Sequence, residues 1–234
     1  MNAMTTLDWV GLGLWLLCWI AYGVWSTRAS ERQPSLMGTV AQSRRAWMRE
    51  AYRRENRVTD SALISSLMHS ATFFSSTTIL ILGALFAILG GIERNTELLD
   101  VVKNLPLARQ ASQQLLEIKA LCLAGVFLYG FLRFTMSLRQ FNLIAILIGA
   151  LPPDRSEPAE THPMVSKAAR LNELAGNNFT HGLRAYYFAV PLVLWLVNPW
   201  LLLAGTALIT WVTYFMEFHS ATVRALSAPD GPSK

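Results

Sequence analysis

Charged residues are scarce in this chain: they make up 15% of its 234 residues, against 53% hydrophobic residues. Five stretches, 9–25, 71–92, 120–132, 185–197 and 200–216, contain no charged residue at all. Water-soluble chains rarely stay uncharged over about 18 residues, the length that crosses roughly 30 Å of hydrocarbon as a helix. The scarcity of charge therefore argues against a soluble globular protein and predicts an integral membrane protein.

Cysteine, an N-terminal basic segment and familiar catalytic motifs are also rare or missing. The two cysteines, Cys18 and Cys122, lie inside apolar runs, which favours inert packing residues over a disulfide or a metal site. No Lys or Arg precedes Arg28, so we expect the first apolar run to be a retained helix rather than a secretory signal. The sequence has no Gly-rich phosphate loop, nucleophile elbow, HExxH or Cys-rich metal pattern, so it predicts no metal site and leaves any cofactor unknown.

The apolar runs predict an all-α fold, a membrane helical bundle with about five spanning helices. The expected spans are 9–25, a part of 62–92, about 118–136, 185–197 and 200–216. We read 164–184 as a separate helix or helical loop before the fourth span. The turn-like Asn198-Pro199 makes the last two spans a tight hairpin. Residues 1–226 are expected to form a single domain, followed by a flexible tail at 227–234.

The stretch 26–60 carries most of the basic charge in the first half of the chain, with eight arginines against four acidic residues. The positive-inside rule places such a segment in the cytoplasm. We therefore expect an inner-membrane protein with a periplasmic N-terminus and a cytoplasmic C-terminus. Because the membrane explains the arginines, nucleic acid is not an expected partner.

Part of this arginine-rich stretch has the pattern of an amphipathic cytoplasmic-side helix. Trp47, Met48, Ala51, Tyr52 and Val58 fall near one face of a helix over 43–58. Such a helix lies in the membrane interface with its arginines near anionic lipid headgroups, or it continues directly into the second span. The sequence leaves both interpretations open.

The second span has an unusually polar first half. At helical spacing, Thr72, Ser76, Gly83 and Gly90 form a stripe of small or hydroxyl-bearing residues. In lipid, small residues let helices approach and hydroxyls hydrogen-bond across the contact. The stripe predicts a helix–helix interface, within the chain or in a homo-oligomer, with a polar ion pathway as the alternative.

Several polar residues are expected near the cytoplasmic face, where ionisable groups need partners. They are Asp60, His69, Arg133, Arg139, Asn142, Asn178, His181, Arg184 and Tyr186, with His219 beside them. One interpretation is a buried salt-bridge network in which Asp60 pairs with Arg57, Arg133, Arg139 or Arg184. A second is an anion or lipid-headgroup site built from Arg139 and Arg184. A third is haem or metal ligation by His69, His181 and His219.

Three stretches, 53–90, 133–152 and 171–196, carry recognisable motifs. The motif residues are Arg57, Asp60, Phe73, Phe74, Ser76, Thr77 and Thr78; Ser137, Leu138, Arg139, Gln140 and Asn142; and Asn178, Gly182, Leu183, Arg184, Ala185, Tyr186, Tyr187 and Phe188. With these motifs the chain resembles the bacterial membrane family catalogued as domain of unknown function 599. The resemblance covers most of residues 10–220 and implies a multipass inner-membrane protein, without implying an activity.

These patterns predict a non-enzymatic, self-associating membrane protein that conducts or transports a small ion, or binds an anion or a lipid headgroup. Its expected partners are the bilayer, anionic lipid headgroups and further copies of the chain. The alternatives are a membrane-embedded enzyme or redox subunit, with haem or quinone, that uses the His/Arg cluster, and an accessory subunit of a larger complex.

Overall fold

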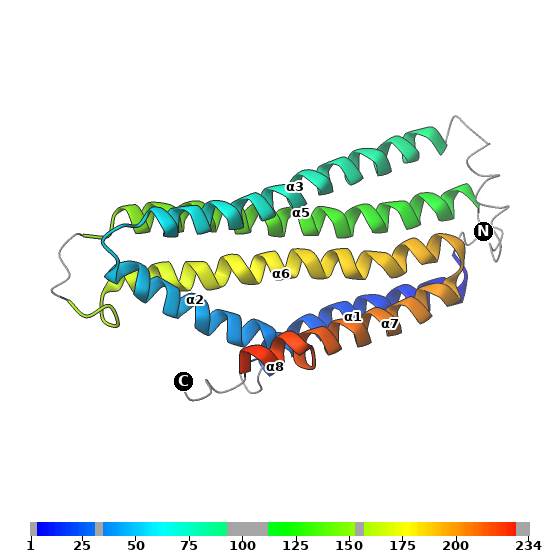
Figure 1. Cartoon of the computed structure of the whole chain (residues 1–234). Helices are drawn as coiled ribbons and strands as arrows, with labels where there is room; N and C mark the ends of the chain where they lie inside the picture. Colours follow the sequence, from blue (N-terminus) through cyan, green and yellow to red (C-terminus); the bar gives the residue numbers. More distant parts are fainter. Residues whose placement is uncertain (1–3, 31–34, 93–111, 153–156, 228–234) are drawn as a thin grey trace. The chain divides into compact units, whose positions relative to one another are not determined.

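The computed structural model describes residues 4–30, 35–92, 112–152 and 157–227. The helices are α1 (Thr6–Ala29), α2 (Leu36–Arg53), α3 (Val58–Ile92), α5 (Gln113–Gly149), α6 (Pro163–Val197), α7 (Pro199–Phe218) and α8 (Ala221–Ser227) (Figure 1). These ranges contain no strand, so the predicted all-α class is confirmed. Apart from Ser227, the expected C-terminal tail lies outside the described residues.

Four helices are long and apolar enough to cross a membrane. They cover Thr6–Ala29, Val58–Gly91, Gln113–Gly149 and Pro199–Leu226. At about 1.5 Å per residue, even a helix of about 20 residues reaches the roughly 30 Å of a hydrocarbon core. The chain is therefore a multipass membrane protein, in agreement with the prediction from its uncharged runs.

The remaining expected span, 185–197, is not a helix of its own. It is the C-terminal part of α6, a 35-residue helix that begins at Pro163 and carries Pro191 in its interior. The sequence reading of 164–184 as a separate helix or loop was wrong, because nothing interrupts the helix between the two segments. Proline removes one backbone donor from a helix, and here α6 tolerates that loss.

The predicted hairpin between the last two apolar runs is confirmed. Asn198 separates α6 from α7, and its side-chain Oδ1 accepts a hydrogen bond from the backbone N–H of Trp200 at 3.0 Å. Pro199 then supplies the first residue of α7, where its missing N–H costs nothing. A Cβ atom at Gly205 would lie 2.9 Å from the Leu194 side chain, so the two helices approach each other closely at this glycine.

The contacts within the chain divide it into two compact units. Unit 1 comprises Met1–Arg28, Thr77–Gly130 and Leu183–Phe215, and unit 2 comprises Ala29–Ser76, Phe131–Gly182 and Met216–Lys234. Each unit has its own hydrophobic core. The expectation of a single domain over 1–226 stays a prediction.

Aromatic side chains dominate the core of unit 1. The Trp15 indole donates a hydrogen bond to the backbone carbonyl of Phe188 at 2.9 Å, which joins α1 to α6. Trp19 packs edge-on against Tyr129 of α5, with 5.2 Å between ring centroids. α1 and α7 run side by side, since a Cβ at Gly11 would lie 3.1 Å from the Leu202 side chain (Figure 1). Cys18 and Cys122 are free thiols packed against this core.

In unit 2, α2 is the predicted amphipathic helix, and its apolar face is covered by the protein itself. Met48 and Tyr52 are buried in a core with Phe141 of α5 and Val165 of α6. Val58, expected on the same face, is instead exposed at the start of α3. α2 also ends at Arg53, before α3 begins. Its apolar face therefore packs on α5 and α6, which fits neither sequence interpretation of α2, as an interfacial helix or as a continuation into the second span.

Candidate functional site

Asp60 is fully buried and paired, as expected, but its partner Arg54 is not one of the four arginines predicted from the sequence. Its Oδ1 accepts hydrogen bonds from the indole of Trp47 at 2.7 Å and from the Arg54 guanidinium at 2.8 Å. Arg57, one of the four expected partners, instead donates to backbone carbonyls at the end of α5, including that of Leu151 at 2.8 Å. The prediction of a buried, paired Asp60 is confirmed, and the choice of partner was wrong.

A second polar group links α5 to α6 inside unit 2. Arg133 donates to the side-chain oxygen of Asn178 at 2.9 Å, and the Asn178 amide donates to Gln140 at 2.9 Å. The hydroxyl of Ser137, one turn along α5, donates to the carbonyl of Ala175 at 2.8 Å. Arg133 and Asn178 were expected in one cluster and are in direct contact. Each of these three bonds joins a side chain of one helix to an atom of the other, so together they link α5 to α6.

The other members of the expected cluster are distributed over both units. His69, Arg139 and Asn142 are exposed, and His181 is half-buried, all in unit 2. Arg184 and Tyr186 belong to unit 1. There Arg184 is buried with its guanidinium carbon 5.4 Å from the centre of the Tyr22 ring, and the Tyr186 hydroxyl lies 2.8 Å from that of Thr78.

The small-residue stripe of α3 is not covered by the part of the chain that the structure describes. Thr72, Ser76, Gly83 and Gly90 are all exposed. A Cβ atom added at Gly83 or Gly90 would meet no atom within 4 Å. The stripe is therefore available to lipid or to another molecule.

Histidine, cysteine and carboxylate side chains do not gather at one point in the described residues. No group of three or more of them stands close enough to hold a metal ion within those ranges. His69, His181 and His219 thus form no described ligand set.

One charged group that sequence reasoning missed lies deep in unit 1. Asp8 and Lys119 are 1% and 2% exposed. Asp8 accepts from the Trp195 indole at 2.9 Å, and Lys119 donates to the Trp195 backbone carbonyl at 2.7 Å. Asp8 also accepts from the backbone and hydroxyl of Thr5, which forms a capping box at the start of α1. The only local pattern in the sequence that involves this group is the Thr-x-x-Asp spacing of Thr5 and Asp8. This spacing predicts a helix cap, but it does not predict a contact with Lys119 or Trp195.

The buried group of Asp8, Lys119 and Trp195 links the ends of three helices, α1, α5 and α6. Lys119, near the start of α5, satisfies a carbonyl in the last turn of α6, where the helix leaves such groups unpaired. A cation at that end also complements the helix dipole. We therefore assign the group of Asp8, Lys119 and Trp195 to structure rather than to ligand binding.

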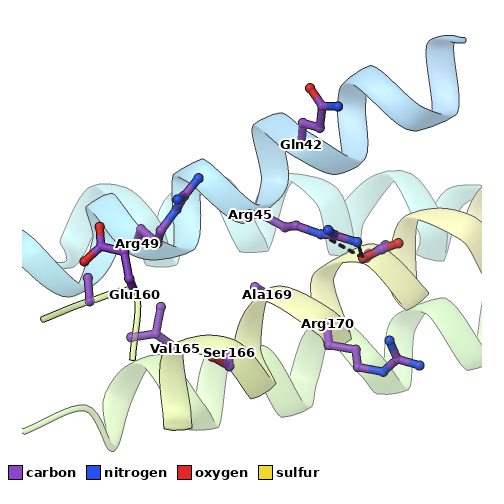
Figure 2. A pocket seen from close by; sticks show the side chains of 10 residues that line it. Gln42, Arg45, Arg49, Glu160, Val165, Ser166, Ala169 and Arg170 are labelled. Carbon is purple, nitrogen blue, oxygen red and sulfur yellow. Dashed lines mark hydrogen bonds and ion pairs between the residues drawn. The ribbon is translucent and has the colours of Figure 1, made fainter. Parts of the chain in front are cut away.

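Unit 2 contains a polar pocket of about 710 Å³ between α2 and α6, which we call the arginine pocket (Figure 2). It is lined by Gln42, Arg45, Arg49, Ala159, Glu160, Val165, Ser166, Ala169, Arg170 and Glu173. Three guanidinium groups and two carboxylates thus meet over an apolar floor.

The charges of the arginine pocket are only partly paired. Arg45 donates to Glu173 through Nε at 3.2 Å and Nη2 at 2.7 Å. Glu160 is engaged from outside the lining by Arg53 at 3.0 Å. Arg49 and Arg170 are exposed and make no hydrogen bond or ion pair with the described residues. Two guanidinium groups in the pocket therefore have their donors available.

Two sets of contacts hold the pocket walls together, one from the middle of α2 and one from its C-terminal end. The buried side of α2 carries Arg44, which donates to the backbone and side-chain oxygens of Asn172 at 3.0 and 2.8 Å. Burial lowers the pKa of the Arg44 guanidinium below its usual value. Gly176 makes room for this guanidinium, since a Cβ there would lie 2.6 Å from its central carbon.

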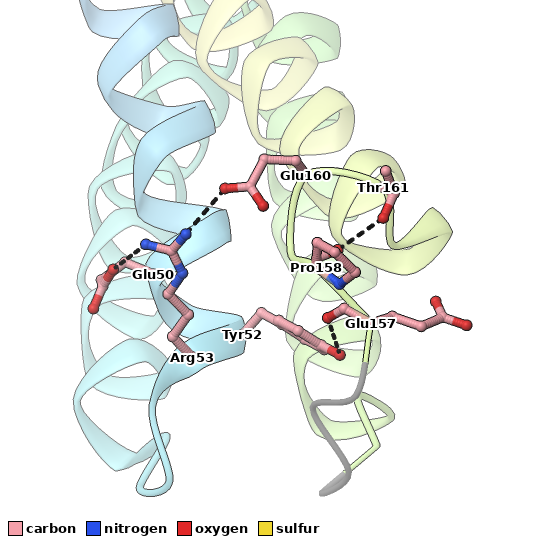
Figure 3. Close-up of polar contacts among 7 residues, drawn as sticks. All are labelled: Glu50, Tyr52, Arg53, Glu157, Pro158, Glu160 and Thr161. Atoms are coloured by element: carbon pink, nitrogen blue, oxygen red, sulfur yellow. Dashed lines mark hydrogen bonds and ion pairs between the residues drawn. The ribbon is translucent and has the colours of Figure 1, made fainter.

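At the C-terminal end of α2, the segment after 156 is hydrogen-bonded to the last turns of the helix (Figure 3). The Tyr52 hydroxyl donates to the Glu157 carbonyl at 3.3 Å, while Arg53 bridges Glu50 and Glu160 at 3.7 and 3.0 Å. The ion pairs are solvent-exposed and contribute little to stability, so they position Glu160 more than they hold the fold.

No candidate site predicted from the sequence included Arg49 or Arg170. A usable signal was the i, i+4 spacing of Arg45, Arg49 and Arg53, which places all three on one face of α2. The contribution of α6 to the pocket had no local signal, because it depends on how α2 packs.

Comparison with known proteins gives a family and no activity. No curated protein and no solved structure matches the chain. A family profile described as "Protein of unknown function, DUF599" matches residues 10–222. This range contains all three motif-bearing stretches and nearly the whole described chain. The protein therefore belongs to the DUF599 family, as its motifs indicated.

Proposed function

We propose that this protein is a non-enzymatic inner-membrane protein that binds a phosphate-type anion, free or in a lipid headgroup, at the arginine pocket. The observation that carries the proposal is the pair of unmatched guanidinium groups of Arg49 and Arg170 in one pocket. Guanidinium presents a planar fork of donors that matches phosphate and carboxylate oxygens. Arg49 extends from α2 and Arg170 from α6, so an anion in the pocket would be bound from both of its walls (Figure 2).

The expected orientation supports this proposal. The positive-inside rule favours a cytoplasmic position for the arginine-rich segment that contains α2, with the N-terminus in the periplasm. The cytoplasmic leaflet carries the anionic lipids and attracts basic segments near its surface. The arginine pocket would then face the compartment in which phosphate-bearing ligands are abundant.

Binding to the full-length protein in a non-ionic detergent tests the proposal. Inorganic phosphate, dioctanoyl phosphatidylglycerol and dioctanoyl phosphatidic acid are titrated calorimetrically. Charged hydrogen bonds contribute about 1.5–3 kcal/mol, so Arg49→Gln and Arg170→Gln should each weaken binding by about 10- to 100-fold. Arg224→Gln is the matched control, because Arg224 is exposed and outside the pocket lining.

Two results would overturn the proposal. One is that none of the three anions binds. The other is that Arg224→Gln weakens binding as much as the pocket variants, since binding would then depend on overall charge alone.

A second candidate function is self-association through α3, with an ion path along the contact. It is favoured by the exposed stripe of Thr72, Ser76, Gly83 and Gly90 on the candidate spanning helix α3. Small residues permit close helix approach in lipid, and hydroxyls offer ions a polar lining. This candidate is independent of the arginine pocket, and its test is given in the Discussion.

A further inference from the structure

We infer that the arginine pocket selects a phosphomonoester dianion, and that an oxygen of this ligand replaces Glu173 as the partner of Arg45. This inference rests on the proposed anion-binding function and names its ligand class. The shared chemistry has two sources, a phosphomonoester lipid headgroup or free phosphate.

The first argument is charge balance. Of the five charged groups that line the pocket, Arg45 and Glu173 neutralise each other, and Glu160 is paired with Arg53. Arg49 and Arg170 remain, so the pocket offers two uncompensated positive charges. A phosphodiester or carboxylate carries one negative charge and would leave one guanidinium unmatched. A phosphomonoester carries about −1.5 to −2 at pH 7 and matches both.

The second argument is the geometry of the Arg45–Glu173 pair. Two N–H groups of Arg45 converge on the single oxygen Oε2 of Glu173, at 3.2 and 2.7 Å. Phosphate oxygens accept guanidinium donors in the same way. The Arg45 side chain is 58% exposed and the Glu173 side chain 24%, so water solvates Glu173 readily once the pair opens. Glu173 is thus an internal competitor that a more highly charged anion displaces from Arg45.

The third argument comes from the uncharged lining. Val165 and Ala159 are buried in the core of unit 2, and with Ala169 they supply an apolar floor. The polar uncharged groups of the lining are limited to Gln42 and Ser166. A glycerol or serine headgroup attached through a diester would need further partners for its own hydroxyl or charged groups. A terminal phosphate carries no further hydroxyl or charged group that needs a partner.

The test compares dioctanoyl phosphatidic acid, dioctanoyl phosphatidylglycerol and inorganic phosphate on the full-length protein by calorimetry. At pH 7.5, phosphatidic acid should bind at least tenfold more tightly than phosphatidylglycerol. Because the second ionisation of a phosphomonoester has a pKa near 6, its affinity should fall by about fourfold at pH 5.5. Phosphatidylglycerol has no second proton to gain, and the pocket lining contains Arg45, Arg49, Arg170, Glu160 and Glu173 but no histidine.

The variant Glu173→Gln tests the role of the internal competitor. It should tighten phosphatidic acid binding by at least threefold, because Arg45 then joins the ligand without a competing carboxylate. Arg224→Gln is the matched control for a change of charge outside the pocket and should leave the affinity unchanged. Thermal unfolding followed by tryptophan fluorescence verifies that each variant is folded.

The outcomes separate this inference from the proposed function. Phosphatidic acid binding at least tenfold more tightly than inorganic phosphate supports a lipid headgroup, and equal binding supports a free phosphate source. Equal affinities for phosphatidic acid and phosphatidylglycerol, or a Glu173→Gln variant that binds no more tightly, would overturn the inference and leave anion binding intact. Absence of binding by all three probes would overturn both.

Discussion

The indole N–H of Trp195, near the end of α6, donates a hydrogen bond to the carboxylate of Asp8, 187 residues earlier at the start of α1. The carbonyl of the same tryptophan accepts from Lys119 of α5, whose ammonium also lies 5.3 Å from the centre of the Trp195 ring. One residue thus connects an acid and a base from different helices. In a membrane protein such buried charges are costly unless paired, so their pairing determines how three helix ends meet.

Removing Lys119 should destabilise the protein strongly. Lys119→Met leaves the Asp8 carboxylate without its nearby cation and the Trp195 carbonyl without a donor. Leaving a buried acceptor without its donor costs about 1–3 kcal/mol, so the melting temperature should fall by several degrees. Thermal unfolding in detergent, followed by tryptophan fluorescence, measures this. The control Lys167→Met removes an exposed lysine, and equal melting of the two variants would show that Lys119 is solvated.

The pair of Asp60 and Arg54 should respond asymmetrically to substitution. Asp60 is fully buried, whereas the Arg54 side chain is 40% exposed. Arg54→Ala therefore leaves a buried carboxylate whose remaining donor is Trp47, and should cost about 3 kcal/mol or more. Asp60→Ala leaves a guanidinium that water can solvate, and should cost about 1–2 kcal/mol. Thermal unfolding of both variants checks the order, and a larger loss for Asp60→Ala would contradict it.

The α3 stripe should govern self-association without affecting the fold of one chain. Gly83→Leu introduces a side chain where no atom of the described residues lies within 4 Å, so melting of the isolated chain should change little. If copies meet along the stripe, the larger side chain separates them, and light scattering after size exclusion should report a smaller assembly. Ala84→Leu, also exposed but on another face of α3, is the control. Equal assembly of both variants would mean that the stripe faces lipid.

The orientation of α2 is open to a labelling test. Ser43 is exposed, in contrast to Ser35, which is buried as the N-cap of the same helix. In a background with Cys18 and Cys122 replaced by alanine, Ser43→Cys should resist a membrane-impermeant thiol reagent in intact cells and react after lysis. Labelling in intact cells would reverse the proposed topology and place the arginine pocket outside.

Local patterns in the sequence were sufficient for the helices and for the membrane. Uncharged runs can only satisfy their backbone groups in lipid as helices, so 9–25, 71–92 and 200–216 predicted α1, α3 and α7. Asn198-Pro199 predicted the hairpin, because proline at a first helical position starts a new helix. The period of Met48, Ala51 and Tyr52 likewise predicted an amphipathic helix.

Only the tertiary structure decided which residues meet. Asp8 and Trp195 are separated by almost the whole chain, and no local period relates them. Several arginines lie near Asp60 in the sequence. The bend between α2 and α3 places Arg54 in contact with Asp60. Arg49 and Arg170 share a pocket because the apolar face of α2 packs on α6 within unit 2. Periodicity specifies the face of a helix that is apolar, whereas the partner of that face depends on contacts between segments far apart in the sequence.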